Sequence, residues 1–243
     1  MNILIPMAGL GARFQGTTNT PKPLIPINGV PMIQLAIQTL GISGRHIFIT
    51  QRAHNLKGLL SSTVPYCEVI EIDEVTEGPA CTALLAENLI NNSTPLIIAN
   101  CDQIMHWDTT LFSSFVSSFP YDGFMVTYTT RTPKNSYVTL DTSGFVTRVA
   151  EKQVISDIST NGIHFWSHGS DFINSANAMI KSNERYNNEF YIAPTYNSLI
   201  KEGKKISIYH IPTQQHFAVG VPDDLEAYRN LPHFFRDGIR APH

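Results

Sequence analysis

Short apolar runs alternate with amphipathic stretches along the first half of the chain. The runs Ile3–Ile5 and Pro95–Asn100 are almost wholly apolar, which is typical of strands buried on both faces of a parallel sheet. Other segments place apolar residues three and four positions apart, the spacing of a helix that covers a sheet. The pattern predicts strands at Ile3–Ile5, His46–Thr50, Cys67–Ile72 and Pro95–Asn100, and helices at Pro31–Leu40, Ala53–Leu60 and Pro79–Ile90.

The rhythm changes near residue 120, where strand-like runs follow one another closely with turns between them. Such spacing is typical of an antiparallel or mixed segment. Helical patterns then return before the last strands. We expect strands at Phe124–Thr130, Tyr137–Leu140, Phe145–Val149, Gly162–Trp166, Lys205–Ile211 and Phe217–Val221, and helices at Ser170–Met179, Glu189–Ile200 and from Pro222.

Together these elements predict one domain over residues 1–230. Strands that alternate with helices form βαβ units, in which helices cover both faces of the sheet. We therefore expect a Rossmann-like, three-layer α/β/α fold with a mixed, mostly parallel central sheet. Its halves, 1–120 and 121–230, would share that sheet, and the tail 231–243 would be loosely attached.

The composition narrows the class of protein. With 243 residues, 42% hydrophobic and 15% charged, the chain falls in the range of globular proteins. A net charge of −3 without a long basic run argues against a nucleic-acid binder. Three cysteines without a CxxC pair indicate reduced thiols. Because we find neither a signal-peptide pattern nor an apolar stretch of about 20 residues, we expect a cytoplasmic protein with no membrane span.

A glycine loop with one arginine follows the first predicted strand. Gly9 and Gly11 would let backbone N–H groups face an anion at the carboxyl edge of the sheet, where ligands of such folds bind. Arg13 adds a guanidinium whose geometry suits phosphate oxygens. The loop lacks the GKS or GKT of a Walker motif and the third glycine of a dinucleotide-binding loop. An ordinary strand-to-loop turn is the alternative interpretation.

Two charged residues strengthen the phosphate hypothesis. Lys22 lies between Pro21 and Pro23, which predicts a stiff, extended segment that could hold a transferring phosphate. Asp102 follows a buried strand at the ligand edge, where a carboxylate suits Mg²⁺ bound with phosphates. The alternatives are a solvated surface lysine and an aspartate that caps a helix near residue 108.

Other candidates are weaker taken alone. Gly78 precedes a predicted helix. The free N–H groups at the N-terminus of that helix could face a ligand, or the segment could be an ordinary helix start. The Glu151–Lys152 pair and Glu189 have the character of solvated surface charges. Histidine and cysteine spacings do not form a zinc motif, and no Gly-x-Ser-x-Gly elbow indicates a hydrolase.

The motifs in their order resemble those of sugar-nucleotide pyrophosphorylases, the nucleotidyltransferases that join an NTP to a phosphorylated small molecule. Ala8–Phe14 with Pro21–Pro26 resembles the family signature G-x-G-x-R…P-K-P-L. The resemblance covers residues 1–230 and is closest to small members from capsule and surface-polysaccharide clusters. Further segments similar to family motifs are Pro31–Ile33, Thr76–Ala80, Ala99–Asp102, Val149–Lys152, Gly162–Phe165, Asn188–Tyr191 and Val219–Leu225.

One position departs from the family pattern. Many members carry a second magnesium-binding aspartate where this chain has Ala218, and the threonine of the same motif is Val221 here. The second metal ligand is therefore in doubt. We expect the nearby Asp223 and Asp224 to cap the last helix instead.

The resemblance implies a role for each candidate residue. Residues 1–120 would bind the NTP and 121–230 the acceptor, with Mg²⁺ as cofactor and neither nucleic acid nor membrane as partner; the oligomeric state stays open. The catalytic residues would be Arg13 and Lys22. The nucleotide-binding residues would be Ala8, Gly9, Gly11, Glu77, Gly78 and Asp102, with Asp102 also the metal ligand. The acceptor-binding residues would be Glu151, Lys152, Gly162 and Glu189.

Two other functions and the choice of substrates remain open. A nucleotide-sugar-dependent glycosyltransferase would carry a D-x-D motif, whereas Asp102 is followed by Gln103 and Ile104. A non-catalytic nucleotide-binding module is the other alternative. The base is not encoded by any single residue, and the acceptor could be a hexose 1-phosphate, phosphocholine or a phosphorylated amino-acid derivative. Four aromatic residues could line a pocket for a quaternary amine or pack in the core: Trp166, Tyr186, Phe190 and Tyr191.

Overall fold

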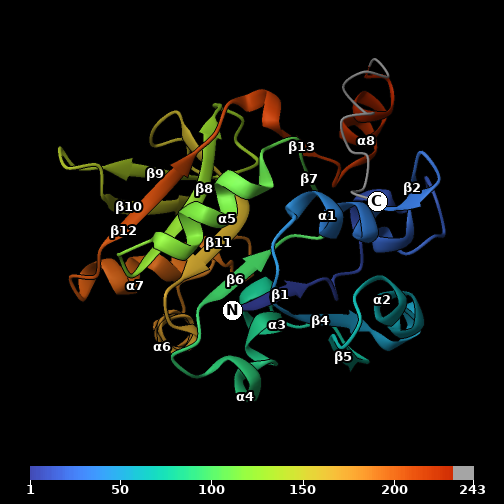
Figure 1. Cartoon of the computed structure of the whole chain (residues 1–243), viewed down its shortest axis with the longest axis horizontal. Helices are drawn as coiled ribbons and strands as arrows, with labels where there is room; N and C mark the ends of the chain where they lie inside the picture. The colour runs from blue at the N-terminus through green and yellow to red at the C-terminus, as the bar shows by residue number, and fades with distance from the viewer. Residues whose placement is uncertain (232–243) are drawn as a thin grey trace.

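The computed structural model describes residues 1–231 and contains a nine-stranded mixed sheet between layers of helices (Figure 1). Two small two-stranded sheets lie beside it. The main sheet comprises β1 (Asn2–Pro6), β4 (Arg45–Gln51), β5 (Glu68–Ile72), β6 (Leu96–Ala99), β8 (Gly123–Thr129), β9 (Ser136–Leu140), β10 (Val146–Glu151), β11 (Ile158–Trp166) and β12 (Ile206–His210). The small sheets pair β2 (Pro26–Ile27) with β3 (Val30–Pro31), and β7 (Gln103–Met105) with β13 (His216–Ala218).

The main sheet joins a parallel block to an antiparallel one. Strands β6, β1, β4 and β5 lie side by side and parallel. Strand β11 then pairs antiparallel with β6 on one side and with β8 on the other, and β12 is parallel to β8. Strands from both halves of the chain thus form one continuous sheet, and the predicted α/β fold with a mixed central sheet is confirmed.

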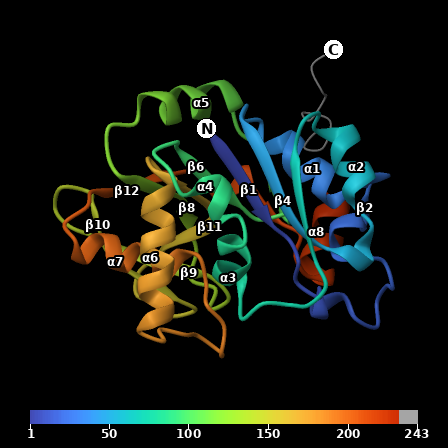
Figure 2. The same ribbon diagram turned by 90° about the horizontal axis from the view of Figure 1, so that it is seen from below.

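Helices cover both faces of the sheet, as alternation along β1 requires. Ile3 and Ile5 belong to clusters on one face, whereas Leu4 belongs to the cluster on the other. The first face carries α1 (Met32–Leu40), α2 (Lys57–Thr63) and α5 (Thr109–Ser118), and the second carries α3 (Pro79–Leu84), α4 (Glu87–Ile90), α6 (Gly169–Lys181) and α7 (Tyr196–Lys201) (Figure 2). The last helix, α8 (Pro222–Arg229), packs near β2 and β3 through Leu225.

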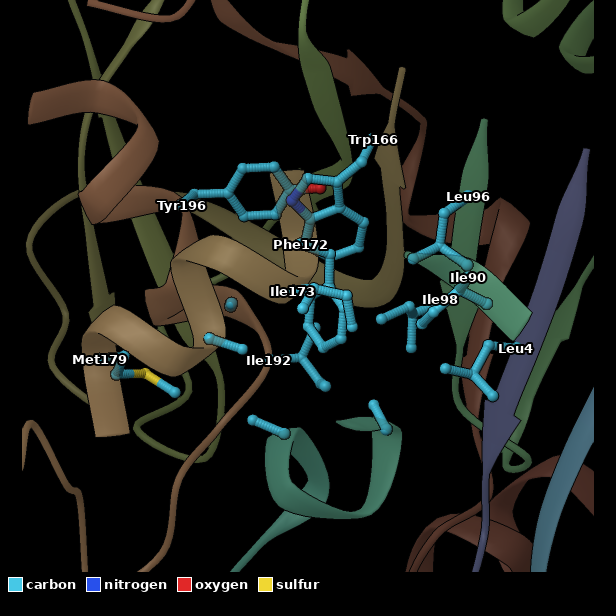
Figure 3. Packing of buried hydrophobic residues seen from close by; sticks show 14 of the residues in the cluster. Leu4, Ile90, Leu96, Ile98, Trp166, Phe172, Ile173, Met179, Ile192 and Tyr196 are labelled. Carbon is cyan, nitrogen blue, oxygen red and sulfur yellow. The ribbon is translucent and has the colours of Figure 1, made fainter. Parts of the chain in front are cut away.

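Aromatic side chains fill the centre of the second face (Figure 3). The rings of Trp166 and Tyr196 stack with centroids 4.6 Å apart and planes 9° apart, and Phe172 lies edge-on to Trp166. Trp166 is fully buried and Phe190 is 1% exposed. Of the four aromatic residues with two interpretations, these two are therefore core residues.

Two predicted helices have different bounds in the structure. The expected helix at Ala53–Leu60 begins only at Lys57, because Asn55 adopts a left-handed conformation (φ 50°) that ends a preceding 3₁₀ turn. The expected helix at Pro79–Ile90 divides into α3 and α4, since the backbone leaves the helical pattern at Ala86.

The segment Glu189–Ile200 departs furthest from its predicted helix. Asn187 and Asn188 have φ values of 48° and 63°, which a helix start does not allow, and Glu189 forms a bridge with Tyr186. Helical structure begins at Ala193 with a 3₁₀ turn that continues into α7. The loop before it is thereby free to reach the edge of the sheet.

Three details near the carboxyl end of the chain also differ from expectation. Strand β13 leaves the main sheet to pair with β7, a strand that the pattern did not predict. Val221 occupies the N-cap of α8, so that Asp223 and Asp224 lie in its first turn rather than at the cap. All but the first residue of the predicted loose tail lie outside the described residues. Within residues 1–231, the helices are too short or too polar to cross a bilayer.

Candidate active site

Two adjoining clefts open at the carboxyl ends of β1 and β6. The first encloses about 480 Å³ and includes the glycine loop, and the second encloses about 240 Å³ beside β11. Ligands of open α/β sheets bind at this edge. Both clefts share the following lining residues: Arg13, Pro79, Asn100, Asp102, Tyr191 and Gly220.

The glycine loop leaves β1 and forms one wall of the first cleft. Ala8, Gly9, Gly11 and Arg13 all line it. Gly11 adopts a left-handed conformation (φ 61°) that favours glycine, and a Cβ there would lie 3.1 Å from the Lys22 Cβ. The buried Gln51 side chain, which the sequence did not single out, donates a 2.8 Å hydrogen bond to the Ala8 carbonyl and anchors the loop to β4.

Lys22 and Asp102 form a salt bridge at the junction of the clefts. Their side chains are 21% and 14% exposed. Burial disfavours the charged form of each side chain, but the opposite charge and the hydrogen bond of its partner outweigh that effect. The pKa of Lys22 is therefore raised, and the pKa of Asp102 is lowered. Both groups are therefore ionised at neutral pH. Gly220 makes this pairing possible, because a Cβ there would lie 2.3 Å from the Asp102 Oδ2.

The local structure around these two residues corrects one expectation. Lys22 begins a 3₁₀ turn (Lys22–Leu24) rather than lying in an extended segment, because the Leu24 N–H bonds back to the Pro21 carbonyl. Asp108 is the residue that caps α5, accepting from two backbone N–H groups. The capping alternative for Asp102 is thereby excluded.

The loop around Gly78 connects the two halves of the site. Gly78 has φ 133°, and a Cβ there would lie 2.5 Å from the Phe190 backbone nitrogen. Gly78 lines the first cleft, whereas Glu77 lines neither cleft. The Glu77 side chain is 64% exposed and turns to Arg185, with oxygen and nitrogen 2.5 Å apart. The Glu77 carboxylate is thus directed at Arg185, and its predicted contact with the base stays a prediction.

The predicted acceptor residues are divided between the clefts. Glu151, Lys152 and Gly162 line the second, and Glu189 lines the first. Lys152 has a positive φ of 51°, and its ammonium lies 4.0 Å from the centroid of the Tyr191 ring and 3.7 Å from Glu151. The Tyr191 hydroxyl, which also contacts the Lys152 ammonium, donates a 2.5 Å hydrogen bond to Glu189.

A chain of hydrogen bonds and charges therefore runs from one carboxylate to the other through Lys152 and Tyr191. Burial raises the pKa of Glu151, although Ser136 donates a hydrogen bond to it and Lys152 lies near. The pKa of Tyr191 is raised by burial and by its bond to Glu189. Tyr191 was one of four aromatic candidates in the sequence, and the segment Asn188–Tyr191 resembles a family motif, but no role was assigned to its hydroxyl.

Several polar groups of the second cleft were not candidates in the sequence. His164 and His216 are 4% and 9% exposed, and burial lowers their pKa values to about 3 and about 4. His216 shares a short hydrogen bond with Gln103, the residue after Asp102. Asn100 lines both clefts at the end of β6. His164 and Asn100 lie in segments that resemble family motifs, and His216 begins β13; those positions are the signals that could have found them.

Asp102 is the one expected metal ligand for which the fit can be tested. Within residues 1–231, no group of three or more His, Cys, Asp or Glu side chains could hold a metal ion. Cys101 lies next to Asp102, but burial raises the pKa of its thiol to about 11, so that it stays protonated. Mg²⁺ bound with phosphates needs only one or two carboxylates. The ionised Asp102 fits that role, and Ala218, which lines the second cleft, offers no second carboxylate.

The fold and the charged clefts are those of an α/β protein that binds its ligands at the carboxyl ends of the strands. Residues 3–150 match the sequence model of the MobA-like NTP transferase domain, and the chain belongs to this family. It is therefore a nucleotidyltransferase, as predicted. A search of curated proteins finds no match.

Solved structures share the fold over nearly the whole chain. The nucleoside-diphosphate-sugar pyrophosphorylase from Vibrio cholerae RC9 is 21% identical, with a TM-score of 0.80 over 94% of this chain and 100% of that one. A putative glucose-1-phosphate thymidylyltransferase from Bacillus anthracis is 16% identical, with a TM-score of 0.71 over 95% and 96%. The inositol-1-phosphate CTP transferase from T. maritima is 14% identical, with a TM-score of 0.75 over 99% and 97%. The predicted family resemblance is confirmed.

Proposed function

We propose that this nucleotidyltransferase joins an NTP to a phosphorylated small-molecule acceptor and releases pyrophosphate. One observation carries the proposal: Arg13, Lys22 and Asp102 lie close together where two separate clefts meet. One cleft offers a glycine loop to a triphosphate, and the other has room for a second substrate. We assign residues 1–120 to the NTP and 121–230 to the acceptor. The resemblance to surface-polysaccharide members extends the proposal to that biosynthesis, in the cytoplasm.

The chemistry asks mainly for positioning and charge stabilisation. An acceptor phosphate oxygen forms a bond to the α-phosphorus of the NTP, and the bond from that phosphorus to the pyrophosphate oxygen breaks. Since the acceptor phosphate is already ionised at neutral pH, no general base is needed. Backbone N–H groups at Gly9 and Gly11 hold the triphosphate, Arg13 stabilises the leaving pyrophosphate, and Lys22 stabilises the α-phosphate during transfer.

Asp102 would hold Mg²⁺ at the phosphates, where the ion supplies Lewis-acid polarisation. Lys22 keeps the Asp102 carboxylate ionised and oriented before the substrates bind. On the acceptor side, Lys152 binds the acceptor phosphate. Glu151 orients Lys152 directly, and Glu189 orients it through the Tyr191 hydroxyl. Gly162 lines the acceptor cleft beside β11 and leaves space there for the Asn100 amide.

A matrix of NTPs against acceptors, with Mg²⁺ or with EDTA, tests the proposal. The acceptors would include sugar 1-phosphates, an inositol phosphate and phosphocholine. We expect pyrophosphate release only when NTP, one class of acceptor and Mg²⁺ are all present. Transfer from a nucleotide sugar would indicate a glycosyltransferase, and NTP binding without turnover would indicate a non-catalytic module; either result contradicts the proposal.

The metal assignment has its own variant. Asp102→Asn removes the only carboxylate placed at the phosphates, so we expect turnover at fixed Mg²⁺ to fall about 100-fold and the Mg²⁺ concentration for half-maximal rate to rise. Asp73→Asn is the matched control, since that carboxylate is 71% exposed and pairs with Arg52. An unchanged Mg²⁺ dependence in Asp102→Asn would exclude the assignment.

A further inference from the structure

A buried histidine lies at the floor of the second cleft. His164 stands on β11 opposite Ile98 of β6 and Met125 of β8, and only 4% of it is exposed. Its ring lines the second cleft, yet its Nδ1 atom is buried without a hydrogen-bond partner among residues 1–231. A buried polar atom without a partner costs free energy, and such atoms are rare in folded proteins. Since His164 lines the second cleft, a ligand bound there is placed to supply the partner that the described residues do not.

Two residues on the same face of β11 flank His164, one on each side along the strand. Trp166 closes the inner side, where it stacks on Tyr196 in the core (Figure 3). On the outer side the corresponding residue is Gly162, which has no side chain. A Cβ at Gly162 would lie 2.2 Å from the Asn100 Nδ2, so that the Asn100 amide covers this glycine. Asn100 and His164 both line the second cleft, so a ligand there meets the Asn100 amide and the His164 imidazole.

The chemistry of this floor differs from that of the rim. Burial lowers the pKa of His164 to about 3, so its imidazole is neutral at working pH. A neutral imidazole has one donor and one acceptor nitrogen, a set that matches a hydroxyl group. The charged residues that line the cleft are Arg13, Asp102, Lys134, Glu151, Lys152 and Asp224. A phosphate would be held among those charges rather than at the floor.

We propose that His164 is a specificity-determining residue, which hydrogen-bonds a hydroxyl group of the acceptor at the floor of the second cleft. The preferred acceptor is then a phosphate ester of a polyhydroxylated molecule, rather than of an alcohol that ends in a quaternary ammonium group. This inference rests on the proposed function, because it identifies one contact within the proposed acceptor site.

Steady-state kinetics with His164→Phe tests the contact. We expect the KM for the best polyhydroxylated acceptor to rise about tenfold while the KM for NTP stays within twofold, since one net hydrogen bond is lost. A series of monodeoxy analogues should contain one analogue that weakens the wild type about tenfold and the variant less than twofold. Trp166→Phe is the matched control: it removes another buried nitrogen that has no partner among the described residues, on the same face but outside the cleft, and should leave both KM values unchanged.

An NMR measurement covers the case in which His164→Phe does not fold. In ¹⁵N-histidine-labelled wild-type protein, the best acceptor of the matrix should shift the His164 ring resonances, and NTP alone should not. Equal effects of His164→Phe on both KM values, a preference for phosphocholine, or an unshifted His164 resonance would each overturn the inference while transferase activity persists. If no pair of NTP and acceptor gives product, the proposed function fails, and the inference fails with it.

Discussion

The two clefts meet at Asp102 but are built in different ways. The first takes the glycine loop, Arg13 and Lys22 from a short segment at the start of the chain. The second gathers side chains from β9, β10, β11, β13 and the loop before α7. A triphosphate is the same in every NTP, so one compact segment of backbone and fixed charges can serve it. An acceptor differs from enzyme to enzyme, and its site is assembled from separate side chains.

The titratable groups of the two clefts also differ in their ionisation. Lys22 and Asp102 hold each other ionised at the junction. In the second cleft, burial raises the pKa of Glu151 and keeps two histidines neutral. The junction is thus suited to a highly charged transition state, whereas the second cleft combines charged groups with neutral polar side chains.

Removing the cation at the junction should have the largest effect. In Lys22→Ala we expect turnover to fall about 10²–10³-fold, because a charge that stabilises the transferring phosphate is lost. Pyrophosphate release across the NTP panel measures it, and the circular dichroism spectrum should stay that of the folded protein. Lys201→Ala is the control, since that side chain is 72% exposed and lies in α7, away from both clefts. Near-normal turnover in Lys22→Ala would contradict the assigned role.

The neutral histidines predict how stability depends on pH. His216 has a pKa of about 4 in the folded protein against 6.5 in the unfolded chain, so the unfolded chain binds more protons between these values. Stability is therefore full above pH 6.5 and is lost as the pH falls toward 4. At pH 5, His216 alone should account for a loss of about 2 kcal/mol, which His216→Phe should remove. Urea unfolding at pH 7.5 and pH 5 measures it, and identical pH dependence in both proteins would refute the assignment.

A change of one methyl group can test the geometry where the clefts meet. In Gly220→Ala the new Cβ would lie 2.3 Å from the Asp102 Oδ2, so the carboxylate must move away from Lys22. We expect turnover to fall about tenfold, because displacement of a positioned group reduces catalysis. Gly58→Ala in α2 is the control, as its Cβ would meet nothing within 4 Å and alanine favours the helix. Equal activities of the two variants would show that the pairing does not matter.

The smallest effect is expected from a single hydroxyl in the second cleft. Tyr191→Phe keeps the ring beside Lys152 but removes the hydroxyl that connects Lys152 to Glu189. The KM for the acceptor should rise about threefold, the value of one partly exposed hydrogen bond, with the KM for NTP unchanged. Tyr186→Phe is the control, since its ring faces the same ammonium at 5.2 Å, and its hydroxyl has no hydrogen bond within residues 1–231. A larger rise in the acceptor KM for Tyr186→Phe than for Tyr191→Phe would show that the contact was assigned to the wrong tyrosine.

Sequence patterns predicted the fold better than the loops that complete the site. Buried strands such as β1 and β6 could be predicted from the sequence, because a short, wholly apolar run between turns is typical of a buried strand. The loop before α7 was not, because the left-handed residues Asn187 and Asn188 interrupt a pattern that otherwise looks helical. Glu77 shows the same limit at the level of a side chain: its position along the chain matched a motif, but the motif did not predict that its carboxylate pairs with Arg185.

The sequence by itself determined the class of fold, the edge of the sheet where the two clefts open, and the glycine loop with its arginine and lysine. These features depend on neighbours within about twenty residues, so local pattern and backbone chemistry suffice to specify them. Only the tertiary structure decided that Asp102 pairs with Lys22, that Tyr191 bridges Lys152 and Glu189, and that His164 faces the second cleft. Each of those contacts joins strands or loops distant in the chain, and their distances depend on how the whole sheet packs.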